Sequence, residues 1–451
     1  MNRLALVEKF RDYIFKAERD LWKIPEPGYK EFKTDTYMKK EFKRLGYDIV
    51  EAENITGFYT VVDTGRVGPT VLVLAELDAL YSALHPDTDK ETGCVHACGH
   101  NVQCSAMLGL ASVLKEEGAL DGLSGKIKLA VVPAEEGIEL GFRSELIKKG
   151  VISFASGKPE FISRRYFDDV DVAFMFHTHS KVEEGKGKYD FYLNKGSNGV
   201  IRKKTVIKGK ATHAGGNPYE GVNALNALSL VLSATNSLRE TFREKNYVRF
   251  HSIVTKGGSS VNVVPDEIVL ESYVRGATVE AILDANKKIN RAIASACSAN
   301  GCGCEITDMA GSEPLTGDEN LTDLAGEVFE EIVGKDGYLK DDMWFPSSTD
   351  MGDVSTLFPS LHAYTVCADG AGHSKDYQIV NPENGCVKNV KAQYGILIKL
   401  LSDGGKRAYE IKSKFKPVFN SVEEFVEHKK SVSKTKDAVK FNDDGTITLD
   451  F

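Results

Sequence analysis

Apolar positions in the first part of the chain alternate between helical and strand-like spacing. Residues 4–21 place apolar side chains on one helical stripe, and a second amphipathic stretch follows at 33–45. Three apolar runs, at 71–74, 127–132 and 172–176, have the continuous hydrophobicity of strands that are buried on both faces. Because helix and strand alternate, this part of the chain is predicted to form an α/β layer with a mainly parallel sheet.

The pattern changes after about residue 189. Segments 200–208, 248–255 and 268–274 alternate in the manner of antiparallel strands, and 221–242 and 279–299 have helical spacing. An order of strand, helix, two strands, helix and strand is typical of a ferredoxin-like α+β unit. This region is therefore predicted to be an insert with its own fold.

Helix-and-strand alternation returns after about residue 314, so the insert is predicted to interrupt the first domain. Near the end of the chain, two short apolar segments flank Asn442–Gly445 and predict a terminal hairpin, while Lys429–Lys436 reads as a solvated linker. The predicted parts are the first domain at 1–187 and 311–415, the insert at 188–310, and a C-terminal extension with the hairpin at 416–451.

Length and composition exclude several classes of protein. A chain of 451 residues is too long for one simple core. The net charge of −8 argues against nucleic-acid binding, which usually needs a basic surface. The N-terminus lacks the apolar core of a signal peptide, and no uncharged stretch is long enough to span a bilayer. We therefore expect a cytoplasmic protein with no nucleic-acid or membrane partner and with most of its eight cysteines reduced.

The segment His96-Ala97-Cys98-Gly99-His100 carries the most informative chemistry. It lies where a predicted strand turns into a helix, and open α/β sheets place their chemistry at such strand ends. The spacing of Cys98 and His100 lets one thiolate and one imidazole reach the same metal ion. A metal-dependent hydrolase is the working hypothesis.

Two adjacent carboxylates, Glu135 and Glu136, directly follow the strand predicted at 127–132. Neighbouring side chains point in different directions, so one can bind metal while the other faces a water molecule, as metal-assisted hydrolysis requires. An isolated Glu-Glu pair is more often a solvated acidic turn. The pair gains weight only because other candidates follow neighbouring strands.

His177 follows the apolar run 172–176 and is preferred over His179 as a ligand because it continues the strand most directly. Taken alone, such a residue is more often a hydrogen-bonded structural histidine. His373 lies among glycines that allow close approach to a ligand, although an ordinary glycine-rich turn explains the segment equally well. In the insert, His213 and Asn262 lie in polar segments that are plain turns in the alternative interpretation.

Taken together, these residues resemble the M20 metallopeptidase family, and in particular its amidohydrolase branch of aminoacylase-like, hippurate and auxin-conjugate hydrolases. Residues 96–101 match the His-Ala-Cys-Gly-His motif of that branch. Asn101 after the motif is more similar to the aminobenzoyl-glutamate hydrolase and M20-domain-containing dipeptidase group. The likeness runs from Trp22 to His373 and does not cover the tail after about Ser413.

The resemblance implies a zinc-exopeptidase-like catalytic domain with a mainly parallel central sheet, and an inserted ferredoxin-like lid and dimerisation domain. It also implies two divalent metal ions, Zn²⁺ or Mn²⁺, with Co²⁺ or Ni²⁺ as alternatives. Glu76 stands where the wider family has a metal-binding histidine, so position 76 is left out of the ligand set. The implied metal ligands are Cys98, His100, Glu136, His177 and His373.

The same resemblance assigns roles around the metals. Glu135 is expected to act as the general base, and Asp78 to orient the ligands. His213 corresponds to the lid histidine that stabilises the oxyanion across a dimer interface, which is worth ~3 kcal/mol of barrier. Asn262 and Arg275 lie where relatives hold the substrate's carbonyl or carboxylate, although an exposed strand arginine is an alternative for Arg275.

We therefore expect a homodimeric two-metal amidohydrolase that cleaves the amide of an N-acyl or N-aminoacyl amino acid. Asn101 favours an unusual dipeptide or aminobenzoyl-glutamate-like substrate over hippurate or auxin conjugates. The alternatives are a general zinc dipeptidase that acts on ordinary α-peptides and a non-catalytic relative that binds a metal or small ligand.

Overall fold

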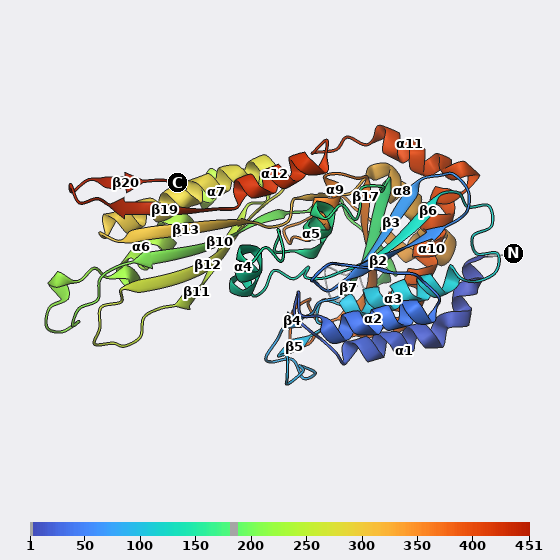
Figure 1. The fold of residues 1–451 in the computed structure, drawn as a ribbon, viewed down its shortest axis with the longest axis horizontal. Coiled ribbons are helices and arrows are strands. Elements are labelled where there is room, and N and C mark those ends of the chain that lie inside the picture. The colour runs from blue at the N-terminus through green and yellow to red at the C-terminus, as the bar shows by residue number, and fades with distance from the viewer. Residues whose placement is uncertain (1–2, 181–187) are drawn as a thin grey trace. The chain divides into compact units, whose positions relative to one another are not determined.

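The computed structural model describes residues 3–180 and 188–451. The chain divides into two compact units, and it passes from one to the other several times (Figure 1). The first unit contains Met1–Gly196, Thr316–Trp344 and Asp353–Val422, and the second contains Ser197–Leu315, Phe345–Gly352 and Glu423–Phe451. These bounds differ from the predicted ranges. The first two crossings lie at 196/197 and 315/316, residues 345–352 belong to the second unit, and the tail joins that unit from Glu423 onward.

The helices and strands of the first unit, in chain order, are a 3₁₀ helix (Arg3–Phe10), α1 (Arg11–Trp22), α2 (Phe32–Arg44), β1 (Val50–Glu51), β2 (Phe58–Asp63), β3 (Thr70–Glu76), β4 (Leu80–Tyr81), β5 (Cys94–Val95), α3 (His100–Val113), β6 (Lys126–Val132), α4 (Leu140–Lys148), α5 (Gly157–Ser163), β7 (Val172–Ser180), β8 (Phe191–Leu193), α8 (Glu319–Val333), β15 (Tyr338–Lys340), β17 (Ser360–Asp369), β18 (Gln378–Ile379), a π-helical turn (Glu383–Lys388), α10 (Asn389–Leu401) and α11 (Lys406–Lys414). The short elements β9 (Gly196–Ser197), β14 (Leu315–Thr316), β16 (Trp344–Phe345) and α9 (Met351–Ser355) lie near the points where the chain changes unit.

The main sheet of the first unit has the strand order β1-β2-β6-β3-β7-β17-β8-β15, with β18 paired to β17. Strand β3 pairs in parallel with β6 and β7, and β7 pairs in parallel with β17, whereas β2 and β8 are antiparallel to their neighbours. The prediction of a mainly parallel central sheet is confirmed. The carboxyl ends of β3, β6 and β7 consequently lie at one edge of the sheet, which is where such folds bind ligands.

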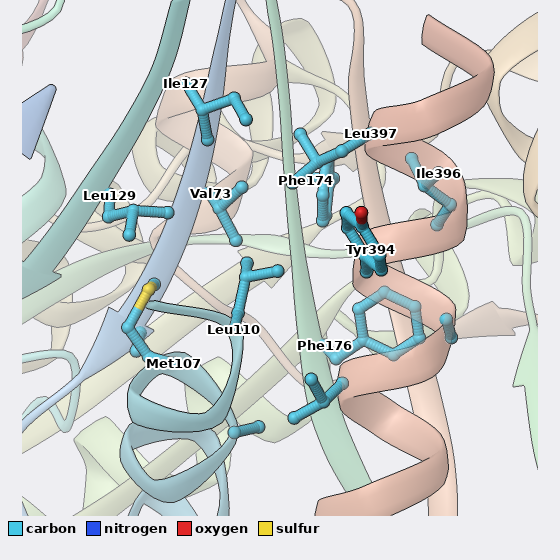
Figure 2. Packing of buried hydrophobic residues seen from close by; sticks show 14 of the residues in the cluster. Val73, Met107, Leu110, Ile127, Leu129, Phe174, Phe176, Tyr394, Ile396 and Leu397 are labelled. Atoms are coloured by element: carbon cyan, nitrogen blue, oxygen red, sulfur yellow. The ribbon is translucent and has the colours of Figure 1, made fainter. Parts of the chain in front are cut away.

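Alternate residues of the central strands face a shared core. Val73 of β3, Leu129 of β6 and Phe174 of β7 are fully buried in it, and they meet Leu110 of α3 and Leu397 of α10 (Figure 2). Helices α1, α2 and α3 lie side by side in the same unit (Figure 1). Each strand is buried on both faces, which explains why its sequence is continuously apolar.

The second unit contains β10 (Gly199–Lys208), α6 (Ala224–Asn236), β11 (Arg249–Lys256), β12 (Glu267–Gly276), α7 (Val279–Ala299), β13 (Gly303–Ala310), α12 (Val422–Val432), β19 (Lys434–Phe441) and β20 (Ile447–Leu449). Its sheet has the order β11-β12-β10-β13-β19-β20, all antiparallel, and α6 and α7 pack against one another beside it. The ferredoxin-like order of strands and helices is confirmed for β10 to β13. Helix α6 is shorter than the predicted 221–242 because 3₁₀ turns follow it.

The C-terminal tail completes this second sheet. The hairpin of β19 and β20 is confirmed, and β19 pairs with β13. The expectation of a solvated linker at Lys429–Lys436 is wrong, because Lys429 is fully buried in α12, donates to the carbonyl of Gly311 and pairs with Glu313. In the described part of the chain, no helix combines the length and apolarity needed to cross a lipid bilayer.

Candidate metal centre

The loop between β5 and α3 presents Cys98 and His100. Gly99 between them has a left-handed backbone (φ 83°), and a Cβ there would lie 2.4 Å from Oγ1 of Thr178. Only glycine fits, and its absence of a side chain lets the start of α3 approach β7 closely. The hydroxyl of Thr178 then donates to the carbonyl of Cys98 at 3.0 Å, which fixes the loop against the strand.

His177 lies within β7 and not after its end, because the strand continues to Ser180. Its Nε2 lies 3.4 Å from Sγ of Cys98, and its Nδ1 lies 2.9 Å from the carbonyl of Thr178. Ligand atoms of Cys98, His100 and His177 all lie within 4.8 Å of one another. His179, the alternative at this strand, stays outside that group and packs its ring against Tyr192 and Tyr364.

The loop after β6 is held from three sides by buried side chains. Ala134 has a left-handed backbone (φ 57°) that an alanine adopts only under constraint, and its N–H donates to Oε1 of Glu31 at 2.8 Å. The N–H of Glu136 donates to Oδ2 of Asp78 at 2.9 Å, and the guanidinium of Arg143 donates to the carbonyl of Glu136. These contacts fix the backbone on both sides of Glu135.

Glu135 and Glu136 both reach the centre. Ligand atoms of His100, Glu135 and Glu136 lie within 4.8 Å of one another. Glu136 is buried, whereas Glu135 is half-buried. The adjacent carboxylates therefore occupy different environments beside the same imidazole.

Asp78 joins this loop to the loop that carries His100. In addition to its bond with Glu136, its carbonyl oxygen lies 2.8 Å and its Oδ1 lies 3.3 Å from Nδ1 of His100. The Nδ1 of His100 is thereby committed to Asp78, and Nε2 is left to face the other candidates.

His373 approaches from the segment after β17. Its backbone is left-handed (φ 65°), and its N–H donates to the carbonyl of Ala97 at 2.9 Å. Its Nε2 lies 3.3 Å from Oε1 of Glu136, and it groups with Cys98 and Glu136 within 4.8 Å. The side chain is 55% exposed, so it lies on the solvent side of the cluster.

Charges in the cluster shift its pKa values strongly. Burial and the Glu136 carboxylate raise the pKa of Cys98, but the imidazoles of His177 and His100 outweigh them and lower it to about 6. The carboxylate of Glu136 raises the pKa of His373 to about 12 and outweighs the partial desolvation of this half-exposed side chain. The cluster thus stabilises a thiolate at neutral pH, which is the form of cysteine that binds metals.

Burial also perturbs groups around the centre. It raises the pKa of Glu31 to about 8, and the carboxylate of Asp78 adds to this shift. Burial lowers the pKa of His362 to about 3, assisted by His177, whose ring centroid lies 5.7 Å away. His362 is therefore a neutral imidazole packed behind His177.

A buried ion pair lies behind His100 and was not anticipated from the sequence. The ammonium of Lys158, on α5, contacts Oε1 of Glu76 at the end of β3, and both side chains are almost fully buried. Oε2 of Glu76 lies 3.1 Å from Nε2 of His100 and accepts a hydrogen bond from Gln103 at 2.8 Å. A lysine in a short helix is normally exposed, so no sequence signal marks Lys158.

The residues of this centre fit a divalent metal ion. One thiolate, several imidazoles and carboxylates are the donors that Zn²⁺ and related ions prefer. Among the described residues, the buried atoms Nε2 of His100 and Oε1 of Glu136 have no hydrogen-bond partner, although buried polar atoms are normally satisfied. In a metal-binding site without its ion, the ligand atoms lack a partner. An unpaired imidazole nitrogen and an unpaired carboxylate oxygen beside a stabilised thiolate fit this description.

Three further predicted residues lie in the second unit. Nδ1 of His213 accepts from the backbone N–H groups of Gly215 and Gly216 at 3.2 and 2.9 Å, so its proton is on the exposed Nε2. The N–H of Ala214 donates to the carbonyl of Asn262 at 2.9 Å. The segments that carry His213 and Asn262 are therefore neighbours on this unit.

Arg275 of β12 is half-buried and donates to Oγ of Ser348 at 2.8 Å. Its guanidinium also lies 5.4 Å from the ring centroid of Tyr273. These contacts hold Arg275 in place on the second unit.

The chain is similar to proteins of a known peptidase family. A family model described as peptidase family M20/M25/M40 matches residues 72–399. N-acetyl-L-cysteine deacetylase from Bacillus subtilis (strain 168) is 28% identical over 333 residues, which cover 72% of this chain and 73% of the relative.

Two solved structures share the fold. One is a dinuclear metal-binding peptidase of the M20 family from Bacillus subtilis, with 18% identity and a TM-score of 0.64, covering 87% of this chain and 99% of that one. The other is an aminobenzoyl-glutamate utilization protein from Klebsiella pneumoniae, with 18% identity and a TM-score of 0.65, covering 88% of this chain and 98% of that one. The fold expected from the sequence motifs is confirmed.

Proposed function

The chain belongs to peptidase family M20/M25/M40, and we propose that it is a two-metal amidohydrolase that cleaves the amide bond of an N-acyl or N-aminoacyl amino acid. The observation that carries the proposal is the convergence of Cys98, His100, Glu136, His177 and His373 with Glu135 in one cluster of the first unit. The Bacillus subtilis deacetylase that the chain resembles acts, by its name, on an N-acyl amino acid.

The proposed metal ligands are Cys98, His100, Glu136, His177 and His373. The proposed ions are Zn²⁺ or Mn²⁺, with Co²⁺ or Ni²⁺ as alternatives, because thiolate, imidazole and carboxylate donors suit all of them. When bound, the ions supply Lewis acidity and lower the pKa of water.

Glu135 is the proposed general base. It lies among the cluster's ligand atoms but is only half-buried, which supports a role in taking a proton from water and returning it to the leaving amine. Asp78 holds His100 and the backbone of Glu136 at once, and it is therefore proposed to orient both.

The second unit is proposed to supply groups for the substrate. His213 carries its proton on an exposed Nε2, which suits a donor to the developing oxyanion. Asn262 and Arg275 are proposed to hold the substrate's carbonyl and carboxylate, for which an amide and a guanidinium are suitable partners.

Within this class, an unusual dipeptide or an aminobenzoyl-glutamate-like compound is the proposed substrate. Asn101, which donates to the buried Glu18 at 2.8 Å, is the sequence feature behind this choice. A general zinc dipeptidase is the main alternative, and equal hydrolysis of many standard dipeptides would favour it.

A homodimer through the second unit is also proposed. Strand β11 is at the edge of its sheet, and its Ile253 and Val254 are 63% and 47% exposed. Leu225 and Leu230 of α6 are 44% and 45% exposed. An apolar unpaired edge is normally covered by a partner, and a monomer in sedimentation equilibrium would remove this part of the proposal.

The test is a Glu135→Gln variant, loaded with metal and assayed by mass spectrometry against N-acyl amino acids, β-alanyl and ω-linked dipeptides, and standard dipeptides. We expect kcat to fall by ~10²–10⁴-fold with the metal content unchanged, because the amide cannot accept the proton. Glu139→Gln is the matched control, since Glu139 lies in the same loop but pairs with Lys30 at 2.7 Å. Wild-type turnover by Glu135→Gln would refute the role of Glu135.

A further inference from the structure

Lys158 is fixed in the interior of the first unit by the packing of α5. Its side chain is fully buried. The preceding Gly157 packs so closely that a Cβ there would lie 1.8 Å from the carbonyl oxygen of Pro133, at the end of β6. Glu160 of the same helix accepts from the backbone N–H of Phe154 at 2.9 Å. The ammonium is therefore positioned by its own helix and is not a flexible surface group.

The carboxylate of Glu76 lies between Lys158 and His100. One of its oxygens, Oε1, contacts the ammonium of Lys158. The other, Oε2, accepts from Gln103 at 2.8 Å and lies 3.1 Å from Nε2 of His100. Nε2 of His100 is one of the buried atoms that have no hydrogen-bond partner in the described chain. A single carboxylate thus separates a buried cation from a proposed metal ligand.

We propose that Lys158 sets the charge of the metal centre by binding Glu76 and keeping that carboxylate out of the ligand set. The proposal rests on the proposed function, because it concerns the same metal site. Lys158 acts through Glu76 and is a positioning residue. A carboxylate next to His100 and unpaired in the protein would be a ready ligand for a divalent cation. Paired with an ammonium, it adds no net negative charge, and the metal is bound by the remaining ligands alone, less tightly than it would be with Glu76 as a further ligand.

In the competing interpretation, Glu76 is itself a metal ligand, and its contact with Lys158 does not keep it from binding the metal. The two interpretations differ in what happens when both charges are removed together. If Lys158 restrains Glu76, loss of both leaves the ligand set and its net charge unchanged. If Glu76 is a ligand, loss of both removes a metal–oxygen bond.

The experiment measures the affinity of the purified full chain for Zn²⁺ and Mn²⁺ by competition with a chromophoric chelator, and the unfolding midpoint of the metal-free protein. We expect Lys158→Met to bind metal ~10-fold or more tightly than wild type, in the range that changes behind metal ligands produce. We expect its metal-free midpoint to fall, because a buried carboxylate loses its partner. The Glu76→Gln/Lys158→Met double variant is expected to bind metal as wild type does and to recover the midpoint.

Lys203→Met is the matched control, since Lys203 is equally buried but lies in the second unit. It should leave the metal affinity unchanged. Unchanged or weaker metal binding by Lys158→Met overturns the proposal, and so does weak binding by the double variant, which remains testable if the single variant does not fold. A wild-type protein that binds no divalent metal at Cys98 and His100 would instead refute the proposed function.

Discussion

Two fully buried lysines, one in each unit, pair with a carboxylate in different ways. Lys203 of β10 contacts Asp308 of β13 and donates to Oδ1 of Asn290 at 2.5 Å, while Asn286 and Asn290 donate to Oδ2 of Asp308 at 2.7 and 3.0 Å. The ion pair joins two strands of the second unit's sheet, and the two asparagines join that sheet to helix α7. In the first unit, the pair of Lys158 and Glu76 instead ends at His100, whose Nε2 has no hydrogen bond in the described chain.

The difference separates a structural network, that of Lys203 and Asp308, from a candidate metal-binding site, that of Lys158, Glu76 and His100. Around Asp308, both carboxylate oxygens are occupied by protein donors, so the charges are compensated within the fold. Both oxygens of Glu76 are likewise occupied, by Lys158 and Gln103, but the neighbouring Nε2 of His100 has no hydrogen-bond partner in the described chain. Buried charge alone therefore does not identify a functional centre. At His100 the buried charge stands beside a thiolate, imidazoles and carboxylates whose ligand atoms lie close together, and among the described residues no such group forms at Asp308.

The largest expected effect on this comparison is a loss of folding stability when the lysine of the second unit is replaced. Lys203→Met should lower the free energy of unfolding of the metal-free protein by about 3–5 kcal/mol, because Asp308 is left charged and only partly compensated. Urea unfolding measures this change. Metal affinity and turnover at saturating metal should remain those of the wild type.

A double variant, Lys203→Met/Asp308→Leu, serves as the control. Removing both charges should restore part of the lost stability, since apolar replacements of a buried ion pair are often neutral or stabilising. A Lys203→Met variant that is as stable as wild type, or that binds metal differently, would break the distinction between the two lysines.

An intermediate effect is expected for Glu31, which combines structural and functional features. Glu31 accepts from the N–H of Ala134 at 2.8 Å and from the hydroxyl of Thr56 at 2.6 Å, so its carboxylate is occupied by protein donors as that of Asp308 is. Its contact nevertheless fixes the backbone next to Glu135. Glu31→Ala should lower kcat by ~10²-fold through misplacement of that base, with little change in KM.

Glu31→Gln is the matched variant for this prediction, because the amide oxygen still accepts from Ala134. It should recover most of the lost kcat while the metal content of both variants stays at the wild-type level. Equal loss of kcat in both variants, or loss of metal, would show that Glu31 does more than hold the loop.

The sequence was sufficient for the parts of the centre that strands carry. Apolar runs predict β3, β6 and β7, and because parallel strand ends converge, the same runs predict that Cys98, Glu136 and His177 lie close together, as the structure shows. The end of β7 was misplaced because Thr178 and His179 look like a loop, yet both are buried strand residues. The hydroxyl of Thr178 bonds to the carbonyl of Cys98 and to the hydroxyl of Tyr377, which lie far away in the sequence.

Residues that act from behind the centre could not be predicted in this way. Lys158, Arg143 and Lys429 are long basic side chains on short or amphipathic helices, and such residues are exposed in most proteins. All three are fully buried, and each is stabilised by contacts with other segments of the chain. A single sequence contains no local signal for a charge whose compensation is entirely tertiary.

The smallest effect, a shift along the pH axis, tests whether the centre stabilises negative charge. The pKa of Cys98 is lowered from 9.0 to about 6, so in the metal-free protein its alkylation by iodoacetamide should rise through pH 6 and level off above it. The matched thiol is Cys94, whose pKa burial raises to about 12, and its labelling should stay negligible throughout. Because the folded pKa of Cys98 is depressed, its contribution to stability should be complete above pH 9 and be lost as the pH falls through 6.

Peptide mass spectrometry between pH 5 and 9 measures the labelling, and Zn²⁺ should suppress it at Cys98. A labelling rate that keeps rising to pH 9 would mean that His100 and His177 do not stabilise a thiolate, and the contrast between an open site and a closed network would lose its chemical basis.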